Sequence, residues 1–199
     1  MQNLKAVMMS KYAVISVMGP HAGESEVQIF RRKREDIDRI GRTFWLHKSN
    51  KAAPSLVQQL CKRAKTEGSD SFCIFIESSS PGGSQAAKSA TPATRYSEDK
   101  IVWHDFPDGL GPVTGNLERG GAHALIFDQL DSADRIAHIN LWDYADFSNQ
   151  EMPLITKIGQ STVCAIKKDT NRNPQRMMSP MRRILAVGRL SEPYCVYLR

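Results

Sequence analysis

The residues at 54–76 constrain the fold more than any other part of the sequence. Apolar side chains recur on one face over 54–67, the spacing of an amphipathic helix. The uninterrupted apolar run Phe-Cys-Ile-Phe-Ile follows at 72–76, and such a run is typical of a strand buried on both faces. Because an aromatic-rich strand is also predicted at 43–47, this part of the chain predicts a strand, a helix that covers one side of a sheet, and a second strand.

Apolar runs elsewhere in the chain predict further strands. A β-branched run over 11–18 predicts a first strand that stops at Gly19-Pro20. Residues 26–40 fit both periodicities, and we interpret them as a strand followed by a short helix. The strands expected in the second half lie at 101–103, 122–127, 136–142, 161–166, 184–187 and 194–198. A turn at 191–193 predicts that the last two of these strands form a β-hairpin.

Length and composition are those of one ordinary globular domain. The chain has 199 residues, of which 41% are hydrophobic and 24% charged. The expected fold class is α/β or α+β: a mixed sheet with one strand–helix–strand unit in the N-terminal half and an antiparallel, strand-rich C-terminal half. In this interpretation residues 1–199 form a single domain, and the Ser-, Gly-, Ala- and Pro-rich stretch at 78–97 is a flexible surface loop.

The sequence favours a cytoplasmic location. No apolar stretch reaches the roughly 18 residues of a membrane-spanning helix, so no membrane partner is expected. Lys5 and Lys11 interrupt what would be the apolar core of a signal peptide. The cysteines are far apart and lie in apolar surroundings, so we expect buried thiols rather than disulfides or zinc ligands. These cysteines are Cys61, Cys73, Cys164 and Cys195.

Charge is distributed unevenly along the chain. The formal net charge is +6, yet residues 101–150 hold two arginines against eight acidic residues. Residues 151–199 hold nine basic and three acidic residues. Consecutive basic residues occur at 31–34, and six more lie within 167–183. Basic clusters of this kind are typical of surfaces that follow a phosphate backbone.

The leading hypothesis is therefore a non-catalytic protein that binds the backbone of DNA or RNA. It would act as an accessory protein or as a subunit of a larger nucleoprotein assembly, with a protein partner on its acidic surface. No cofactor and no metal ion are expected. The residues expected to bind nucleic acid are Arg31, Arg32, Lys33, Arg34, Lys62, Arg63, Lys167, Lys168, Arg172, Arg176, Arg182 and Arg183.

The stretch 171–183 carries the strongest binding signal. It mixes four arginines with amide side chains and methionines, groups that contact phosphates, base edges and apolar surfaces. Tyr194 and Tyr197 on the last predicted strand could add a stacking platform for unpaired bases.

A metal-dependent nuclease or phosphoester hydrolase is the competing hypothesis. Asp70, Glu98 and Asp99 are the carboxylates that would bind Mg²⁺, and Lys100 would support the attacking water. A second alternative is a protein–protein interaction module with segregated acidic and basic faces.

Other signals of chemistry are incomplete. The stretch 82–89 resembles a phosphate-binding loop, but alanine replaces the glycine that should precede Lys88. None of the five histidines has the spacing of a zinc site. His123 and His138 fall within apolar runs, and we expect both to be hydrogen-bonded core residues.

Overall fold

The apolar run at 72–76 forms β3 (Phe72–Glu77), a central strand of an eight-stranded mixed sheet. The computed structural model describes residues 10–19, 24–47, 50–78, 110–112, 123–159, 161–168 and 181–198. The strand order is β2–β5–β8–β3–β1–β7–β6, and β4 pairs separately with β8. The other strands are β1 (Tyr12–Met18), β2 (Thr43–His47), β4 (Leu110–Pro112), β5 (His123–Asn140), β6 (Tyr144–Asp146), β7 (Thr162–Lys167) and β8 (Met181–Leu198).

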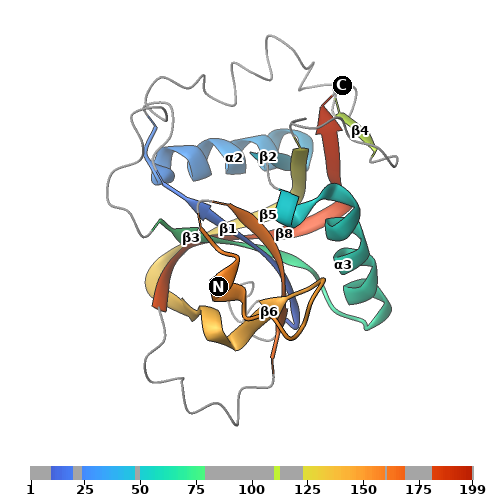
Figure 1. The fold of residues 1–199 in the computed structure, drawn as a ribbon. Helices are drawn as coiled ribbons and strands as arrows, with labels where there is room; N and C mark the ends of the chain where they lie inside the picture. The colour runs from blue at the N-terminus through green and yellow to red at the C-terminus, as the bar shows by residue number, and fades with distance from the viewer. Residues whose placement is uncertain are drawn as a thin grey trace.

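Two helices and three short 3-10 turns complete the described part (Figure 1). The helices are α2 (Glu26–Ile40) and α3 (Pro54–Thr66), and the turns are η1 (Asn50–Ala52), η3 (Leu141–Asp143) and η4 (Leu154–Thr156). The predicted fold class is confirmed, because β1 and β3 pair in parallel while β5, β8, β6 and β7 form antiparallel pairs. None of the helices in the described ranges has the length and apolarity needed to cross a membrane.

The predicted strand–helix–strand unit exists, but its two strands are not neighbours. β2 lies at one edge of the sheet and pairs with β5, whereas the parallel partner of β3 is β1. The helix α3 begins at Pro54, which suits a first helical turn because its missing N–H has no partner there. Its residues Val57, Leu60 and Ala64 are fully buried, as their spacing predicts.

The prediction of a strand followed by a short helix over 26–40 is wrong. The whole segment is the single helix α2, and both of its ends carry helix-capping signals. Ser25 and Gln28 form a reciprocal capping box, in which each side chain accepts a hydrogen bond from the backbone N–H of the other. At the other end Gly41 has a φ of 78°, a left-handed conformation that glycine adopts without steric cost.

The predicted C-terminal hairpin is also wrong, because β8 is one continuous strand. Leu125 of β5 pairs with Cys195, and Phe127 pairs with Leu190. Residues 191–194 are therefore an insertion in the ladder rather than a reversal of the chain, and β5 pairs with β8 on both sides of it. The two strands predicted at 122–127 and 136–142 are likewise one strand, β5. The predicted strand at 101–103 and the loop predicted at 78–97, apart from Ser78, lie outside the described residues.

Two large apolar clusters fill the two faces of the sheet, and a third, smaller cluster contains Phe44, Ala124, Ile126 and Val196. The cluster on the helix face lies under α2 and α3 and includes Phe30, Leu60 and Phe75. The cluster on the opposite face contains mainly aliphatic side chains and is closed by η3 and η4. All four cysteines are free and buried, as predicted, and all belong to the cluster on the helix face.

Candidate nucleic-acid interface

The four consecutive basic residues of α2 point in different directions, because successive residues of a helix are about 100° apart. Arg31 is exposed. Arg32 forms a two-pronged ion pair with Glu24, with N···O distances of 3.1 and 2.6 Å. Arg34 donates from Nη1 to the hydroxyl of Ser132 on β5 at 3.0 Å. The run therefore does not form one continuous basic surface.

Lys33 is buried rather than exposed to solvent. Only 3% of its surface is accessible, and its Nζ lies 3.8 Å from the centroid of the Phe44 ring. Burial, and to a smaller extent the charge of Arg32, lower the pKa of Lys33 to about 7, because both disfavour the ammonium form. This ammonium cannot reach a phosphate in the described conformation, so we leave Lys33 out of the proposed interface.

Strand register separates the basic residues of β7 from those of β8. Ile166 pairs with Tyr12 at the start of β1, which places Lys167 and Lys168 at that end of the sheet. Ile184 pairs with Ile76 near the end of β3, which runs parallel to β1. Arg182 and Arg183 therefore lie at the opposite end of the sheet from Lys167 and Lys168.

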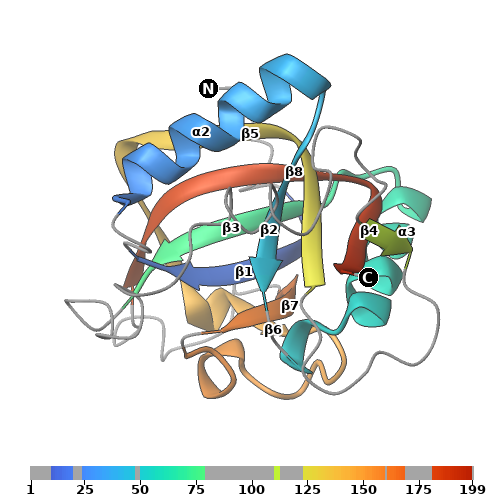
Figure 2. The ribbon, with the colours of Figure 1, turned by 90° about the horizontal axis from the view of Figure 1, so that it is seen from above.

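Helix α2 begins at the same end of the sheet as β8 (Figure 2). Phe30 packs edge-on against Phe75 at a centroid distance of 5.4 Å, and Phe75 pairs with Ala186. Ser132, the partner of Arg34, also pairs with Ala186. We name the set at this end the α2–β8 group. It consists of Arg31, Arg34, Arg182 and Arg183.

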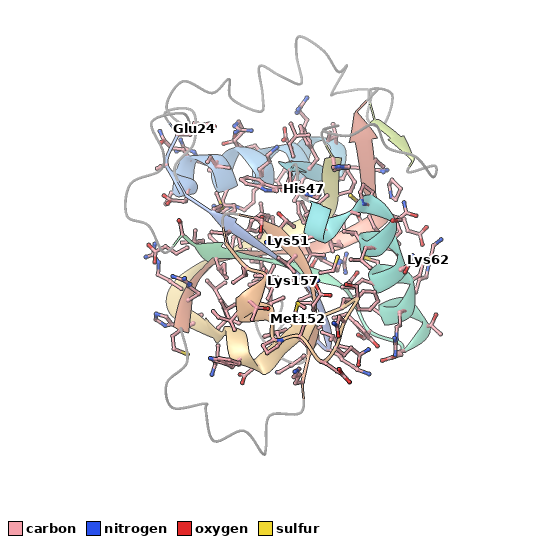
Figure 3. All side chains as sticks on the ribbon, in the orientation of Figure 1. Glu24, His47, Lys51, Lys62, Met152 and Lys157 are labelled. Carbon is pink, nitrogen blue, oxygen red and sulfur yellow. The ribbon has the colours of Figure 1, made fainter. Side chains whose placement is uncertain are left out.

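Helix α3 supplies the basic residues at the other end. Lys62 points away from the sheet on the outer side of α3 (Figure 3). Arg63 lies 3.5 Å from a carboxylate oxygen of Glu67, which also binds Lys11 at 3.4 Å. The backbone N–H of Lys167 donates to the carbonyl of Lys11 at 2.8 Å, which joins α3 and β7 in one region. We name this set the α3–β7 group. It consists of Lys62, Arg63, Lys167 and Lys168.

The remaining predicted residues are only partly described. Arg172 and Arg176 lie outside the described residues, and so do Glu98, Asp99 and Lys100 of the nuclease hypothesis. Asp70 precedes β3, and its carbonyl accepts a hydrogen bond from Ser10 Oγ at 3.2 Å. Within the residues that the structure describes, no three His, Cys, Asp or Glu side chains are grouped so that they could hold a metal ion.

Tyr194, predicted to add a stacking platform, is partly buried. It packs against the cluster on the helix face, and its hydroxyl donates to Glu192 at 3.2 Å. Burial raises the pKa of Tyr194, and the negative charge of Glu192 adds to the effect. The side chain of Tyr197 lies outside the described part.

Sequence reasoning missed a group of three side chains on neighbouring strands. His47 of β2, His123 of β5 and Cys195 of β8 lie together at one end of the sheet, on its helix face. His138, predicted to be a core residue, is exposed instead. The prediction of a hydrogen-bonded histidine is not met at the Nδ1 of His123, which is buried and has no partner within the described ranges. Alternation along single strands cannot show which residues of different strands lie side by side.

Comparison with known proteins gives no relative of this chain: no family model, no curated protein and no solved structure matches it. The proposals below therefore rest on the chemistry of the described residues.

Proposed function

We propose that this chain is a cytoplasmic, non-catalytic accessory protein that binds the phosphate backbone of nucleic acid through its α2–β8 group. The observation that carries the proposal is that α2 and the start of β8, about 150 residues apart in the sequence, lie at the same end of the sheet, with Arg183 on the helix face and Arg182, opposite Ile139, on the other face. A guanidinium group can donate two parallel hydrogen bonds to one phosphate, which suits arginine to this role. Arg31 and Arg182 form no ion pair within the described part of the chain, so their charges are available.

The α3–β7 group is the weaker candidate because it holds its own carboxylate. Glu67 accepts hydrogen bonds from Tyr12, Lys11 and Arg63. The hydrogen bond from Tyr12 is the main reason that the pKa of Glu67 lies below its usual value. In the α2–β8 group only Arg183 has such a partner, Glu77 at 3.3 Å. At the α3–β7 group a polyanion would compete with a carboxylate that three donors hold in place, whereas at the α2–β8 group it would compete with Glu77 at Arg183 alone and with the neutral Ser132 hydroxyl at Arg34.

Two further features support the wider proposal. The segment that contains Arg172 and Arg176 leads directly into β8, which begins at Met181, and so enters the sheet at the proposed interface. Buried free thiols on the helix face suit a reducing compartment, which supports the cytoplasmic assignment. Of the acidic residues described within 101–150, the partly exposed Asp131 and Asp143 would be available to a basic protein partner, whereas Asp128 is paired with Arg189 and Asp146 is buried.

Binding of labelled single-stranded RNA, single-stranded DNA and duplex DNA, followed by fluorescence anisotropy, tests this proposal. We expect a Kd in or below the range of about 10⁻⁴ to 10⁻⁶ M at physiological salt, with log Kd rising linearly with log salt concentration. The triple variant Arg31→Gln, Arg34→Gln, Arg182→Gln should reduce the salt slope by about 2.7 on duplex DNA and about 2.1 on single strands, since each lost phosphate contact removes about 0.9 or about 0.7.

A charge-matched control comes from the other end of the sheet. The triple variant Lys62→Gln, Arg63→Gln, Lys168→Gln removes the same number of positive charges from the α3–β7 group. We expect it to keep most of the wild-type affinity and slope. Equal losses in the two triple variants would show that only net charge matters, and binding weaker than about 10⁻⁴ M in wild type would end the proposal.

A further inference from the structure

The edge strand β2 is joined to the sheet at its end by two histidines. His47 and His123 are directly opposite each other in the antiparallel ladder of β2 and β5. Their ring centroids are 5.5 Å apart, and the rings are tilted by 36°. The Sγ of Cys195 on β8 lies 3.9 Å from Nε2 of His47. Figure 3 shows His47 below α2, near the start of α3.

Both imidazoles lack the partners that would stabilise a positive charge. His47 is only 8% exposed, and the Nδ1 atoms of His47 and His123 are buried with no hydrogen-bond partner in the described part of the chain. An unpaired charge in such surroundings is costly, because water is lost and nothing replaces it. Burial therefore disfavours the protonated form of both rings in the folded protein, and more strongly for His47, because His123 is only partly buried.

Among the described residues, the charged groups on the elements packed around β2 do not offset a proton on these rings. β5 contributes His123 itself. β8 contributes the thiol of Cys195, which stays uncharged because burial raises its pKa. On η1, the Lys51 ammonium donates to the carbonyl of Lys157 at 2.6 Å. On α2, Asp36 accepts from Thr43 and Lys33 lies on Phe44, both at the other end of β2.

We propose that the His47–His123 pair is an acid-sensitive latch, which holds β2 on β5 at neutral pH and releases it when either ring takes up a proton. β2 is suited to local release because it has five residues, lies at the sheet edge, and pairs with β5 alone among the described strands. β2 has two states. In the attached state burial disfavours protonation of the rings, and in the detached state the rings are hydrated and can be protonated.

The direction of the effect follows from proton binding. Burial lowers the pKa of His47 from 6.5 to about 3, and the neighbouring His123 adds to the shift. Burial also lowers the pKa of His123. As the pH falls below 6.5, the detached state binds protons that the attached state does not, so acid favours detachment. Between about pH 7.5 and pH 5.0 the shift is about 30-fold for His47 alone and about 900-fold if both rings stay neutral.

Amide hydrogen exchange, read by mass spectrometry as protection factors, tests the latch. In the wild-type full chain, protection over 43–47 should fall by at least about 30-fold between pH 7.5 and 5.0, while protection over 72–77 changes far less. In His47→Leu, which replaces the ring by an apolar side chain, most of this fall should disappear. The matched control is His138→Gln, because His138 is an exposed histidine on the same strand as His123.

Two results would overturn the proposal. One is a fall in protection over 43–47 that is smaller than about threefold in wild type, or equally large in His47→Leu. The other needs no variant: an NMR titration of the wild-type histidine ring protons in which His47 titrates near its usual pKa of about 6.5. The titration decides the question if His47→Leu does not fold, and neither result depends on nucleic-acid binding.

Discussion

The helix face of the sheet buries all four cysteines, His47 and a hydroxyl pair formed by Ser16 and Thr162, whereas the opposite face buries mainly Ile, Val and Leu side chains. Lys33 of α2 is buried against Phe44 of β2, which belongs to a third, smaller cluster with Ala124, Ile126 and Val196. The charged side chain buried on the opposite side is Asp146 of β6. The two faces therefore share hydrophobic stabilisation, but the helix face also buries His47 and the thiols, whose charged forms are disfavoured by burial.

Substitutions at two neighbouring residues of β3 compare how much each face contributes to stability through apolar contacts. They should cause the largest loss of unfolding free energy among these predictions. Phe75 on the helix face makes edge-on ring contacts with Phe30, Trp45 and Phe127, while Ile74 lies on the opposite face. Phe75→Ala should lower the free energy of unfolding by about 4 kcal/mol and Ile74→Ala by about 3 kcal/mol. Urea denaturation at pH 8 measures both. A greater loss for Ile74→Ala would contradict the importance of the ring contacts.

Lys33→Met tests the cost of a buried amine. Because the folded-state pKa of Lys33 is about 7 and the unfolded value 10.5, the unfolded chain holds the extra proton between these values. Wild-type stability should therefore rise from pH 7 to pH 10 by up to about 1.4 kcal/mol per pH unit. The methionine variant should lack this rise and be more stable than wild type by about 2 kcal/mol at pH 7.

The control for Lys33→Met is Lys62→Met, the same substitution at an exposed position of α3. It should keep the wild-type dependence of stability on pH. If Lys33→Met shows the wild-type rise as well, Lys33 is not the group responsible.

Asp146→Asn probes the one charged side chain buried on the opposite side. Burial opposes its ionisation, but hydrogen bonds from Ser148, Lys157 and the Asn149 N–H outweigh this and hold the pKa below its usual 3.8. The carboxylate therefore stabilises the fold at neutral pH, and this contribution is lost as the pH falls through the folded-state pKa. The variant should cost about 2 kcal/mol at pH 7 and less in acid. A loss that is the same at pH 3 and pH 7 would contradict this.

The smallest expected loss of stability comes from the Ser16–Thr162 pair, whose buried hydroxyls are polar but do not ionise near neutral pH. Ser16 Oγ and Thr162 Oγ1 are 2.9 Å apart and buried. Ser16→Ala should cost about 1 kcal/mol, because it leaves the threonine hydroxyl without its partner. The double variant with Thr162→Val should recover most of that loss, in a double-mutant cycle measured by thermal unfolding. Neither variant should alter how stability depends on pH. A change would show that buried polar groups that do not ionise also affect the pH dependence of stability.

The sequence predicted local elements well and long-range pairing poorly. Periodicity identified α3, β1, β3 and β7, since each is determined by its own pattern of burial. The capping box of Ser25 and Gln28 was readable as a helix signal, and weighing it against the competing strand pattern would have identified α2. The continuity of β8 was not readable, because it depends on a partner strand about 60 residues earlier.

The same reasons apply to the candidate interface. Consecutive residues such as Arg31 and Lys33 look equivalent in sequence, yet the helix exposes the first and buries the second. Lys168 and Arg182 are only 14 residues apart, and strand register places them at opposite ends of the sheet. His47 and His123 are 76 residues apart, and the ladder between β2 and β5 brings them together.

The position of β8 in the sheet has a consequence for synthesis of the chain. β8 lies between β5 and β3, yet it follows both in the sequence. While the ribosome is still making the residues before Met181, β3 and β5 each present an unpaired edge that could join the wrong strand. We therefore expect these two edges to stay open to wrong pairing until β8 inserts between them and closes the ladder.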